Sequence, residues 1–197
     1  MSGLTWEDAR RGGGQRVTVP ATMGPDEATR ELAPRLSALA GERAPASFDE
    51  KSDKLGVPVV TLDGYSGSGK STLAAALTRL LPGWQVLHLD DWYPGWDGLE
   101  AGARIARRIA ADLRGGRASS YEAWDWENDA TGETTRVPLA PTIIEGCGAI
   151  EAEADIAIWI ADPGEDERRA RALARDGQTY APHWRRWADQ DLGRSIH

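Results

Sequence analysis

The sequence has little that would point to secretion, membrane insertion or general nucleic-acid binding. Its 197 residues contain a single cysteine, Cys147, which excludes an internal disulfide and is typical of a reducing compartment. No apolar run approaches the roughly 18 to 20 residues that cross a bilayer, and the first residues lack the apolar core of a signal peptide. The formal net charge of −8 disfavours a general nucleic-acid binder. We therefore expect a cytoplasmic protein whose partners include neither a membrane nor a nucleic acid.

One glycine- and serine-rich stretch has the spacing of a phosphate-binding loop. Residues 64–72 read GYSGSGKST, after the apolar run 57–63 and before an alanine-rich helical segment. Glycines let backbone N–H groups curl around phosphate oxygens, and the start of a helix adds the positive end of its dipole. The alternative is an ordinary Gly/Ser-rich turn, but this bare pattern is expected by chance in roughly 1% or fewer of chains this long.

The loop therefore predicts binding of a nucleoside triphosphate. Lys70 can reach the terminal phosphates, and the Ser71 hydroxyl can ligate Mg²⁺. A GTPase-type switch is excluded because that class needs an Asn-Lys-x-Asp motif, and the only asparagine, Asn128, is followed by Asp129. The predicted nucleotide-binding residues of the loop are Gly64, Ser66, Gly67, Ser68, Gly69, Lys70, Ser71 and Thr72.

From residue 57 onward, short buried strands alternate with helical segments. This alternation predicts an α/β domain over residues 57–197, with a mostly parallel sheet and helices on both faces. Residues 1–56 are expected to form an N-terminal extension with a short edge strand at 15–19, one helix at 26–40 and a charged linker at 41–56. The expected strands of the domain are 57–63, 84–89, 142–144 and 156–160, and its expected helices are 70–81, 99–113, 165–175 and 182–191.

Two acidic side chains follow strands at the edge where a parallel sheet binds its ligands. Asp90 follows the strand at 84–89, and Glu145 follows the strand at 142–144. Phosphoryl transfer to a hydroxyl needs Mg²⁺ and a group that accepts the hydroxyl proton. We interpret Asp90 as that proton acceptor and Glu145 as a residue of the metal site, against the alternative that acidic residues follow strands because they form good turns. Asp162, which precedes a Pro-Gly pair, is interpreted as such a turn residue.

Five segments, in the same order along the chain, resemble motifs of the uridine kinases. Residues 90–93 (DDWY) are similar to their Asp-x-Phe-Tyr motif and to the Asp-Asp-Phe-Phe form of nicotinamide riboside kinases. Residues 96–98 (WDG) resemble Phe-Asp-His-Pro, residues 124–126 (WDW) resemble Tyr-Asp-Phe, and residues 144–146 (IEG) resemble Phe-Glu-Gly. Residues 166–176 (DERRARALARD) resemble the Asp-x-Arg-x-x-Arg-x-x-x-Arg-Asp lid helix. The set is similar to the uridine kinase–phosphoribulokinase group of P-loop kinases, and looks closest to uridine-kinase-like ATP-binding proteins of high-GC bacteria.

This resemblance implies a P-loop kinase fold with a five-stranded parallel sheet, ATP and Mg²⁺ as cofactors, and an arginine-bearing lid at about residues 165–190. It implies that Asp90 is the general base, that Arg168 is a catalytic residue beside Lys70, and that Arg171 binds the nucleotide. Glu145 joins Ser71 at the metal site. The substrate-binding residues that the resemblance implies are Tyr93, Asp97, Trp124 and Asp125.

The identity of the phosphoryl acceptor stays open at this point. Only three residues separate Tyr93 from Asp97, and Gly98-Leu99 replaces the His-Pro of the uridine kinases. We expect a phosphotransferase that acts on the alcohol group of a nucleoside, a sugar or a vitamin-like molecule, with a homodimer as one option for its assembly. The alternative is a nucleotide-sensing protein that binds ATP without catalysis.

Several other residues allow two interpretations. The four tryptophans expected in loops either stack on a ring of the acceptor or cover junctions between loops and core. His88 is expected to be a core residue, and Cys147 a structural one. The segment around His183 and Trp184 is left without a role. The four loop tryptophans are Trp92, Trp96, Trp124 and Trp126.

Overall fold

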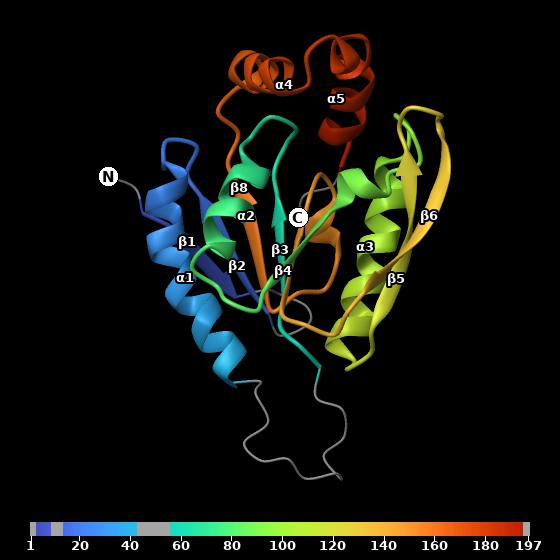
Figure 1. Ribbon diagram of the computed structural model, residues 1–197. Coiled ribbons are helices and arrows are strands. Elements are labelled where there is room, and N and C mark those ends of the chain that lie inside the picture. Colours follow the sequence, from blue (N-terminus) through green and yellow to red (C-terminus); the bar gives the residue numbers. More distant parts are fainter. Residues whose placement is uncertain (1–2, 9–13, 43–55, 195–197) are drawn as a thin grey trace.

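A central, mostly parallel sheet organises this computed structural model, which describes residues 3–8, 14–42 and 56–194. Within those residues the sheet has six strands in the order β1-β2-β8-β3-β7-β4 (Figure 1). The five strands from β2 to β4 run parallel to one another, as expected, and β1 adds an antiparallel edge that the sequence did not predict. The strands span Thr5–Asp8 (β1), Gln15–Val19 (β2), Val59–Asp63 (β3), Gln85–His88 (β4), Thr142–Glu145 (β7) and Ile156–Ile160 (β8).

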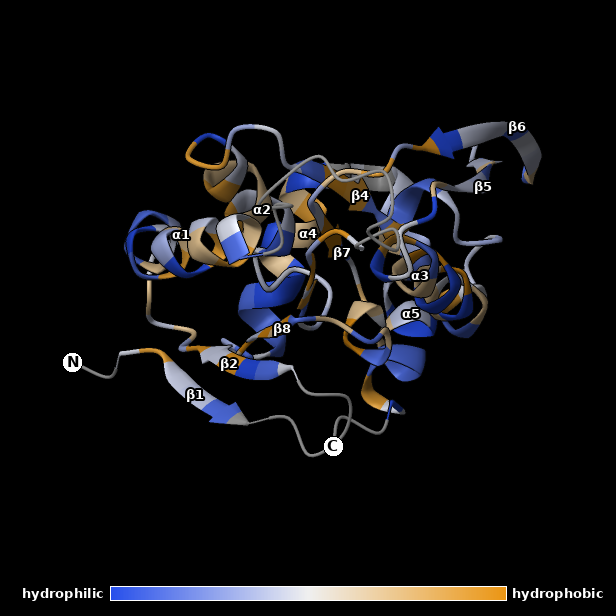
Figure 2. Ribbon diagram, turned by 90° about the horizontal axis from the view of Figure 1, so that it is seen from below, coloured by the Kyte–Doolittle hydropathy of each residue, from blue (hydrophilic) through white to orange (hydrophobic). Residues whose placement is uncertain are grey.

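Helices cover both faces of this sheet, which confirms the predicted α/β class. Helices α1 (Pro25–Glu42) and α2 (Lys70–Thr78) lie on one side of the strands, and α3 (Leu99–Arg114) lies on the other (Figure 2). The strands are apolar on both faces because each face is buried; all five residues of β3 are buried. Val60 and Leu62 pack in the cluster under α1 and α2, while Val59 packs in the cluster under α3, as the alternation of a strand requires.

The N-terminal strands belong to the same sheet as the rest of the chain. β2 has the predicted bounds, but it lies between β1 and β8 rather than at an edge, and it pairs in parallel with β8. Leu32 and Leu36 of α1 are fully buried in the cluster that also contains residues of α2. The described part of residues 1–56 therefore shares one sheet and one hydrophobic core with the residues that follow. Most of the predicted linker at 41–56 lies outside the described residues.

A separate two-stranded hairpin, which the sequence analysis did not predict, lies beside α3 (Figure 1). It consists of β5 (Ser119–Asp125) and β6 (Ala130–Val137), paired antiparallel. Of the eight residues of β6, only Val137 is buried. A strand that is exposed on both faces carries no alternation of apolar and polar residues, which is the usual signal of a strand.

Two helices, α4 (Glu165–Tyr180) and α5 (Trp184–Leu192), lie above the carboxyl ends of the strands (Figure 1). They occupy the region predicted as the lid. The backbone of α4 bends at Gly177, whose φ of 57° and ψ of −134° suit glycine alone. Asp162 forms the predicted turn before α4, since its Oδ1 accepts the Gly164 N–H at 2.7 Å. Among the helices described, none has the length and apolarity that crossing a membrane would require.

Candidate active site

The phosphate loop connects the end of β3 to the start of α2, as the sequence predicts. Gly67 and Gly69 have φ values of 81° and 104°, which side-chain-bearing residues rarely adopt. A Cβ atom on Gly67 would also lie 2.2 Å from the carbonyl oxygen of Arg168 in α4, so only glycine fits beneath that helix. The loop thus curls tightly into the first turn of α2 and leaves the N–H groups of that turn facing the site.

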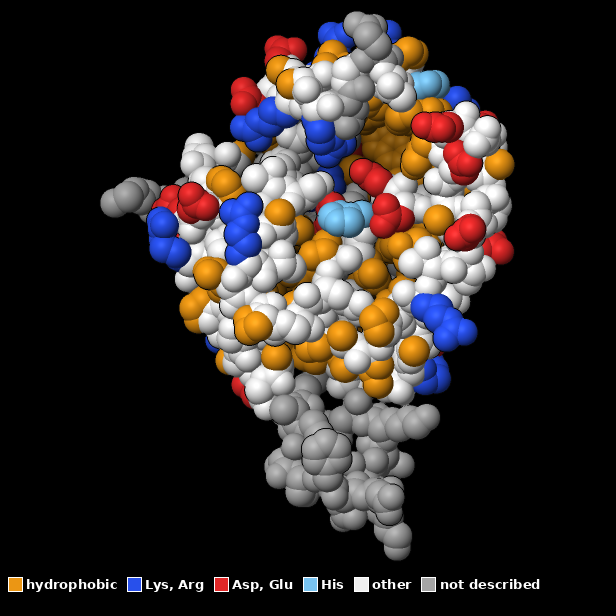
Figure 3. Space-filling model, viewed as in Figure 1, with side chains coloured by type: hydrophobic (Ala, Val, Ile, Leu, Met, Phe, Trp, Pro, Cys, Tyr) orange, Lys and Arg blue, Asp and Glu red, His pale blue; other side chains and the backbone are white. Residues whose placement is uncertain are grey.

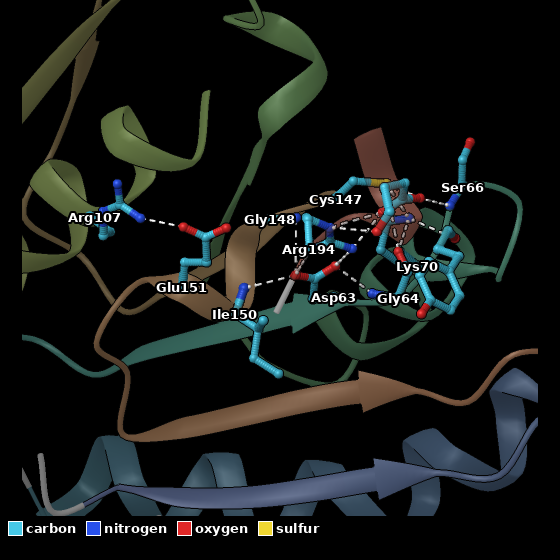
Figure 4. Close-up of polar contacts among 12 residues, drawn as sticks. Asp63, Gly64, Ser66, Lys70, Arg107, Cys147, Gly148, Ile150, Glu151 and Arg194 are labelled. Atoms are coloured by element: carbon cyan, nitrogen blue, oxygen red, sulfur yellow. Dashed lines mark hydrogen bonds and ion pairs between the residues drawn. The ribbon is translucent and has the colours of Figure 1, made fainter. Parts of the chain in front are cut away.

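Lys70, the first residue of α2, holds a buried positive charge at the base of the loop. Its Nζ donates to the carbonyl oxygens of Gly64, at 2.8 Å, and Tyr65, at 3.1 Å (Figure 4). Burial lowers the pKa of Lys70, but the nearby groups of Cys147, Asp191 and Glu145 outweigh it and raise the pKa above its ordinary value. The ammonium group therefore keeps its charge at neutral pH.

A cavity of about 1000 Å³ extends from this loop to the underside of α4 and α5. Figure 3 shows it as a hollow with hydrophobic side chains on its wall and charged side chains around its mouth. The volume is at the upper end of the range for pockets that bind small molecules. The predicted site residues that line it are Ser66, Gly67, Gly69, Lys70, Ser71, Thr72, Asp90, Tyr93, Glu145 and Arg171.

Asp90 lies in a short 3-10 helix, Leu89–Asp91, directly after β4, and its side chain faces the cavity. Asp90 is exposed to solvent within the cavity, but the surrounding protein takes some of the water from its carboxyl group, and this desolvation raises the pKa of Asp90. The negative charge of Glu145 raises that pKa further, while the charges of Lys70 and Arg175 oppose the rise. A carboxylate with a raised pKa is a better proton acceptor than an ordinary one, which suits the predicted role of general base.

The two predicted metal-site residues, Ser71 and Glu145, also lie together in the cavity. Glu145 ends β7 and is 3% exposed, and its carboxylate accepts a hydrogen bond from the Ser71 hydroxyl. Burial acts to raise the pKa of Glu145, but the hydrogen bond from His88 and the charge of Lys70 outweigh it and hold the pKa below its ordinary value. Glu145 is thus an anion beside a hydroxyl, which is a donor pair that Mg²⁺ prefers.

His88 has a partner that the sequence analysis missed. It ends β4 opposite Glu145 in the neighbouring strand, and its Nδ1 lies 2.6 Å from Glu145 Oε1. The side chain is 45% exposed, so it is not the core residue that was predicted. The hydrogen bond to Glu145 raises the pKa of His88 although burial opposes it. Sequence alone could not pair the two residues, because the pairing depends on strand order and register.

From the contact between His88 and Glu145 we expect a contribution to folding stability that depends on pH. A histidine with a raised folded-state pKa adds stability below its ordinary pKa of about 6.5, and that stability is lost as the pH rises through the raised value. The free energy of unfolding of the wild type should therefore exceed that of His88→Gln most at about pH 5 to 6, with a difference that shrinks towards pH 9. Urea unfolding of both proteins across this range measures the difference. A difference that stayed constant with pH would show that His88 does not titrate against Glu145.

Of the two arginines predicted to act on the nucleotide, the structure brings only Arg171 to the cavity. Arg171 lines the cavity together with Arg175 of the same helix. Arg168 is 3% exposed, and its Nε donates to Asp162 Oδ1 at 2.8 Å. Its guanidinium also packs over the ring of Tyr65, at 5.0 Å. In this structure Arg168 lies behind the loop rather than in the cavity, because the turn of α4 that carries it rests on the loop backbone.

Of the four predicted acceptor-binding residues, only Tyr93 lines the cavity. Its hydroxyl donates to the Cys147 carbonyl oxygen at 2.6 Å. Asp97 is exposed and forms an ion pair with Arg186 of α5, outside the cavity. Trp124 and Asp125 lie in β5, where Asp125 caps the hairpin turn by accepting the Asn128 N–H at 3.1 Å. None of these last three side chains is among the residues that line the cavity.

A group of aromatic side chains also lines the cavity. Trp96 stacks on His183, with ring centroids 4.2 Å apart and an interplanar angle of 6°. It also contacts Trp126, at 4.9 Å, and Tyr180, at 5.4 Å. Trp187 completes this lining from α5. The segment around His183, for which the sequence suggests no role, thus supplies part of this aromatic lining. Its high content of aromatic residues is the sequence feature that could have indicated this.

Comparisons with known proteins identify no family for this chain. No family model matches it, and no curated protein matches it. Among solved structures, it is similar to a putative fructose transport system kinase from a Silicibacter species, with 23% identity and a TM-score of 0.49, over 80% of this chain and 86% of that one. It is also similar to a possible uridine kinase from Bacillus stearothermophilus, with 19% identity and a TM-score of 0.43, over 84% of this chain and 97% of that one. These likenesses are too distant to carry a functional argument, which rests on the site itself.

Proposed function

We propose that this chain is an ATP- and Mg²⁺-dependent kinase that moves the γ-phosphoryl group of ATP to a hydroxyl group of a small molecule. The proposal is supported by the lining of one cavity, which combines the phosphate loop with its lysine, a carboxylate with a raised pKa and a group of aromatic side chains. The phosphoryl donor, the proton acceptor and the acceptor molecule would thus meet in one cavity, as transfer to a hydroxyl requires.

The nucleotide end would bind the triphosphate through fixed positive groups. The N–H groups at the start of α2 and the Lys70 ammonium face the same end of the cavity, and Arg171 reaches it from α4. The N–H groups and the Lys70 ammonium are held by the fold before a ligand arrives, so they would stabilise charge on phosphate oxygens with little reorganisation.

Ser71 and Glu145 would hold the metal ion. Magnesium in kinases is usually held by one or two protein groups together with substrate phosphates, and this pair supplies one hydroxyl and one carboxylate of lowered pKa. When bound, Mg²⁺ would neutralise the charge that phosphate oxygens carry during transfer. His88 would keep Glu145 oriented through its 2.6 Å contact.

Asp90 and the aromatic lining of the cavity would orient the hydroxyl group of the acceptor molecule and exclude water from it. Asp90 would take the proton from the hydroxyl as that oxygen attacks the γ-phosphorus, and the bond from the γ-phosphorus to the bridging oxygen of the β-phosphate would break to release ADP. Trp96, Trp126 and Tyr180 offer apolar ring faces that suit a planar ring or the apolar face of a sugar. A nucleoside, a sugar or a vitamin-like alcohol therefore fits the cavity, and ADP release measured against a library of such compounds tests the proposal.

We expect tight ATP binding to require Mg²⁺ and guanine nucleotides to show no dominant preference. The physical reason is that the metal offsets phosphate repulsion in a site whose own acids, Asp90 and Glu145, would otherwise oppose the triphosphate. Calorimetry with ATP and GTP, with and without EDTA, checks both points. Ser71→Ala should lose most of the dependence on Mg²⁺, whereas Ser119→Ala in the hairpin should keep it. GTP binding far more tightly than ATP would overturn the assignment of the donor.

A further inference from the structure

The C-terminal helices hold one residue of the phosphate loop, Ser66, by all of its polar groups. The Ser66 N–H donates to Asp191 Oδ2 of α5 at 2.8 Å (Figure 4). The Ser66 hydroxyl lies 2.9 Å from the hydroxyl of Tyr180, at the end of α4. The Ser66 carbonyl oxygen accepts a longer bond, of 3.4 Å, from Nη1 of Arg168. Ser66 is 8% exposed, so its polar groups depend largely on these partners.

Asp191 is itself fixed by a buried ionic cluster. Arg194 donates to Asp191 Oδ1 through Nε, at 3.0 Å, and through Nη2, at 2.5 Å. The same guanidinium donates to both carboxylate oxygens of Asp63, at 2.8 and 3.2 Å. Asp63 ends β3 and accepts the N–H of Gly64, the first residue of the loop, at 2.6 Å. The cluster thus joins the end of α5 to both the start and the middle of the phosphate loop.

Because this cluster is buried, each of its charged groups depends on the others as partners. Asp63 and Asp191 are both 0% exposed, and the side chain of Arg194 is 7% exposed. Loss of one member of a buried ion pair leaves an uncompensated charge, so the remaining groups keep their arrangement only while all are present. A loop with three glycines of positive φ has many alternative conformations. The hydrogen bonds from the C-terminal helices to Ser66 restrict them.

We propose that the C-terminal helices keep the phosphate loop in its binding conformation through Ser66, with Asp191 and Tyr180 as positioning residues. This positioning role rests on the proposed function only in that Mg²⁺-ATP is taken as the ligand of the phosphate loop. Coupling between two sites is reciprocal, so the nucleotide at the loop must also stabilise the end of α5. α4 and α5 would therefore respond to the nucleotide although neither Tyr180 nor Asp191 needs to touch it.

Tyr180→Phe is the gentler test, because it removes only the hydroxyl group. The loss of one hydrogen bond that orders the loop should raise the Kd for Mg²⁺-ATP about threefold to tenfold. Hydrogen exchange of residues 64–70 in the free protein should become faster, while exchange in β7 stays unchanged. Tyr121→Phe is the matched control, since it removes another hydroxyl group, one that contacts Asp91 and not the loop. It should change neither quantity.

Asp191→Asn tests the charged partner. It keeps an oxygen for the Ser66 N–H but removes the charge that Arg194 balances, and we expect the Kd for Mg²⁺-ATP to rise about tenfold or more. In the wild type, Mg²⁺-ATP should slow hydrogen exchange in residues 184–192. This protection should be smaller in Tyr180→Phe and in Asp191→Asn. Asp189→Asn is the control, because Asp189 lies on the exposed side of the same helix.

The measurements separate this inference from the proposed function. If Tyr180→Phe speeds exchange in the loop but the wild type binds no Mg²⁺-ATP, the positioning role stands and the proposed function fails. If Tyr180→Phe leaves both loop exchange and the Kd at wild-type values, the positioning role is wrong, whatever the wild type binds. Should Asp191→Asn fail to fold, Tyr180→Phe alone decides.

Discussion

Lys70→Ala should lower ATP turnover by at least about 10³-fold. Lys70 places a buried cation at the base of the phosphate loop, where its ammonium group contacts the carbonyl oxygens of Gly64 and Tyr65. Removal of that cation leaves the charge that develops on the transferred phosphoryl group without its fixed partner. Steady-state ADP release from Mg²⁺-ATP measures the effect, and thermal unfolding confirms that the variant is folded.

Two comparisons make this result specific to the site. Arg169→Ala removes a positive charge from the exposed side of α4 and should leave turnover within about threefold, because exposed charges contribute little. Lys70→Arg keeps the charge but not the shape of an ammonium group, and should recover only part of the rate. A folded Lys70→Ala protein with turnover near that of the wild type would rule out this loop as the catalytic site.

Asp90→Asn should lower kcat by about 10² or more and leave the affinity for ATP within a few-fold of the wild type. Asp90 faces the cavity from the end of β4, where it can take a proton from the acceptor without being needed to hold the nucleotide. A general base must be unprotonated, and the pKa of Asp90 is raised. The wild-type rate should therefore fall as the pH drops through that raised pKa, and Asp90→Asn should lack this acid limb.

Asp91→Asn is the matched control for this variant. Asp91 is the next residue, is exposed, and accepts a hydrogen bond from Tyr121 of the hairpin. Its kcat should stay within about threefold of the wild type, since it is not among the residues that line the cavity. If Asp90→Asn instead abolished ATP binding and left the rate per bound ATP unchanged, Asp90 would be a metal-binding or structural residue.

The elements that the sequence predicted well are those whose signals are local. The strand at 156–160 and the helix that begins at Leu99 match β8 and α3 closely, because a short apolar run and an amphipathic period are each visible in one window. The phosphate loop was equally clear, since its glycines, its lysine and the following helix are contiguous. In contrast, β2 was placed at an edge because sheet order depends on pairing between distant segments.

The candidate site shows the same division between local and distant signals. The sequence places Asp90 and Glu145 near each other because each follows a strand and parallel strands end at one edge of the sheet, and both line the cavity. Asp191 escaped notice because its partner Ser66 lies 125 positions away along the chain. Arg168 and Arg171 show a related limit: the lid motif gives the spacing of the arginines but not which of them faces the cavity.

Transfer of the γ-phosphoryl group from ATP to an alcohol is the direct test of the proposed kinase activity. The wild-type protein would be incubated with Mg²⁺ and ATP labelled on its γ-phosphorus, together with the small-molecule alcohol that gives the fastest ADP release. We expect the label to move to the hydroxyl oxygen of that alcohol in the wild-type protein, and Asp90→Asn to slow this transfer by about 10² or more at saturating ATP. Two results would contradict the proposed kinase function. In one, the label appears only as inorganic phosphate, at a rate that no alcohol changes. In the other, the protein binds no Mg²⁺-ATP at all.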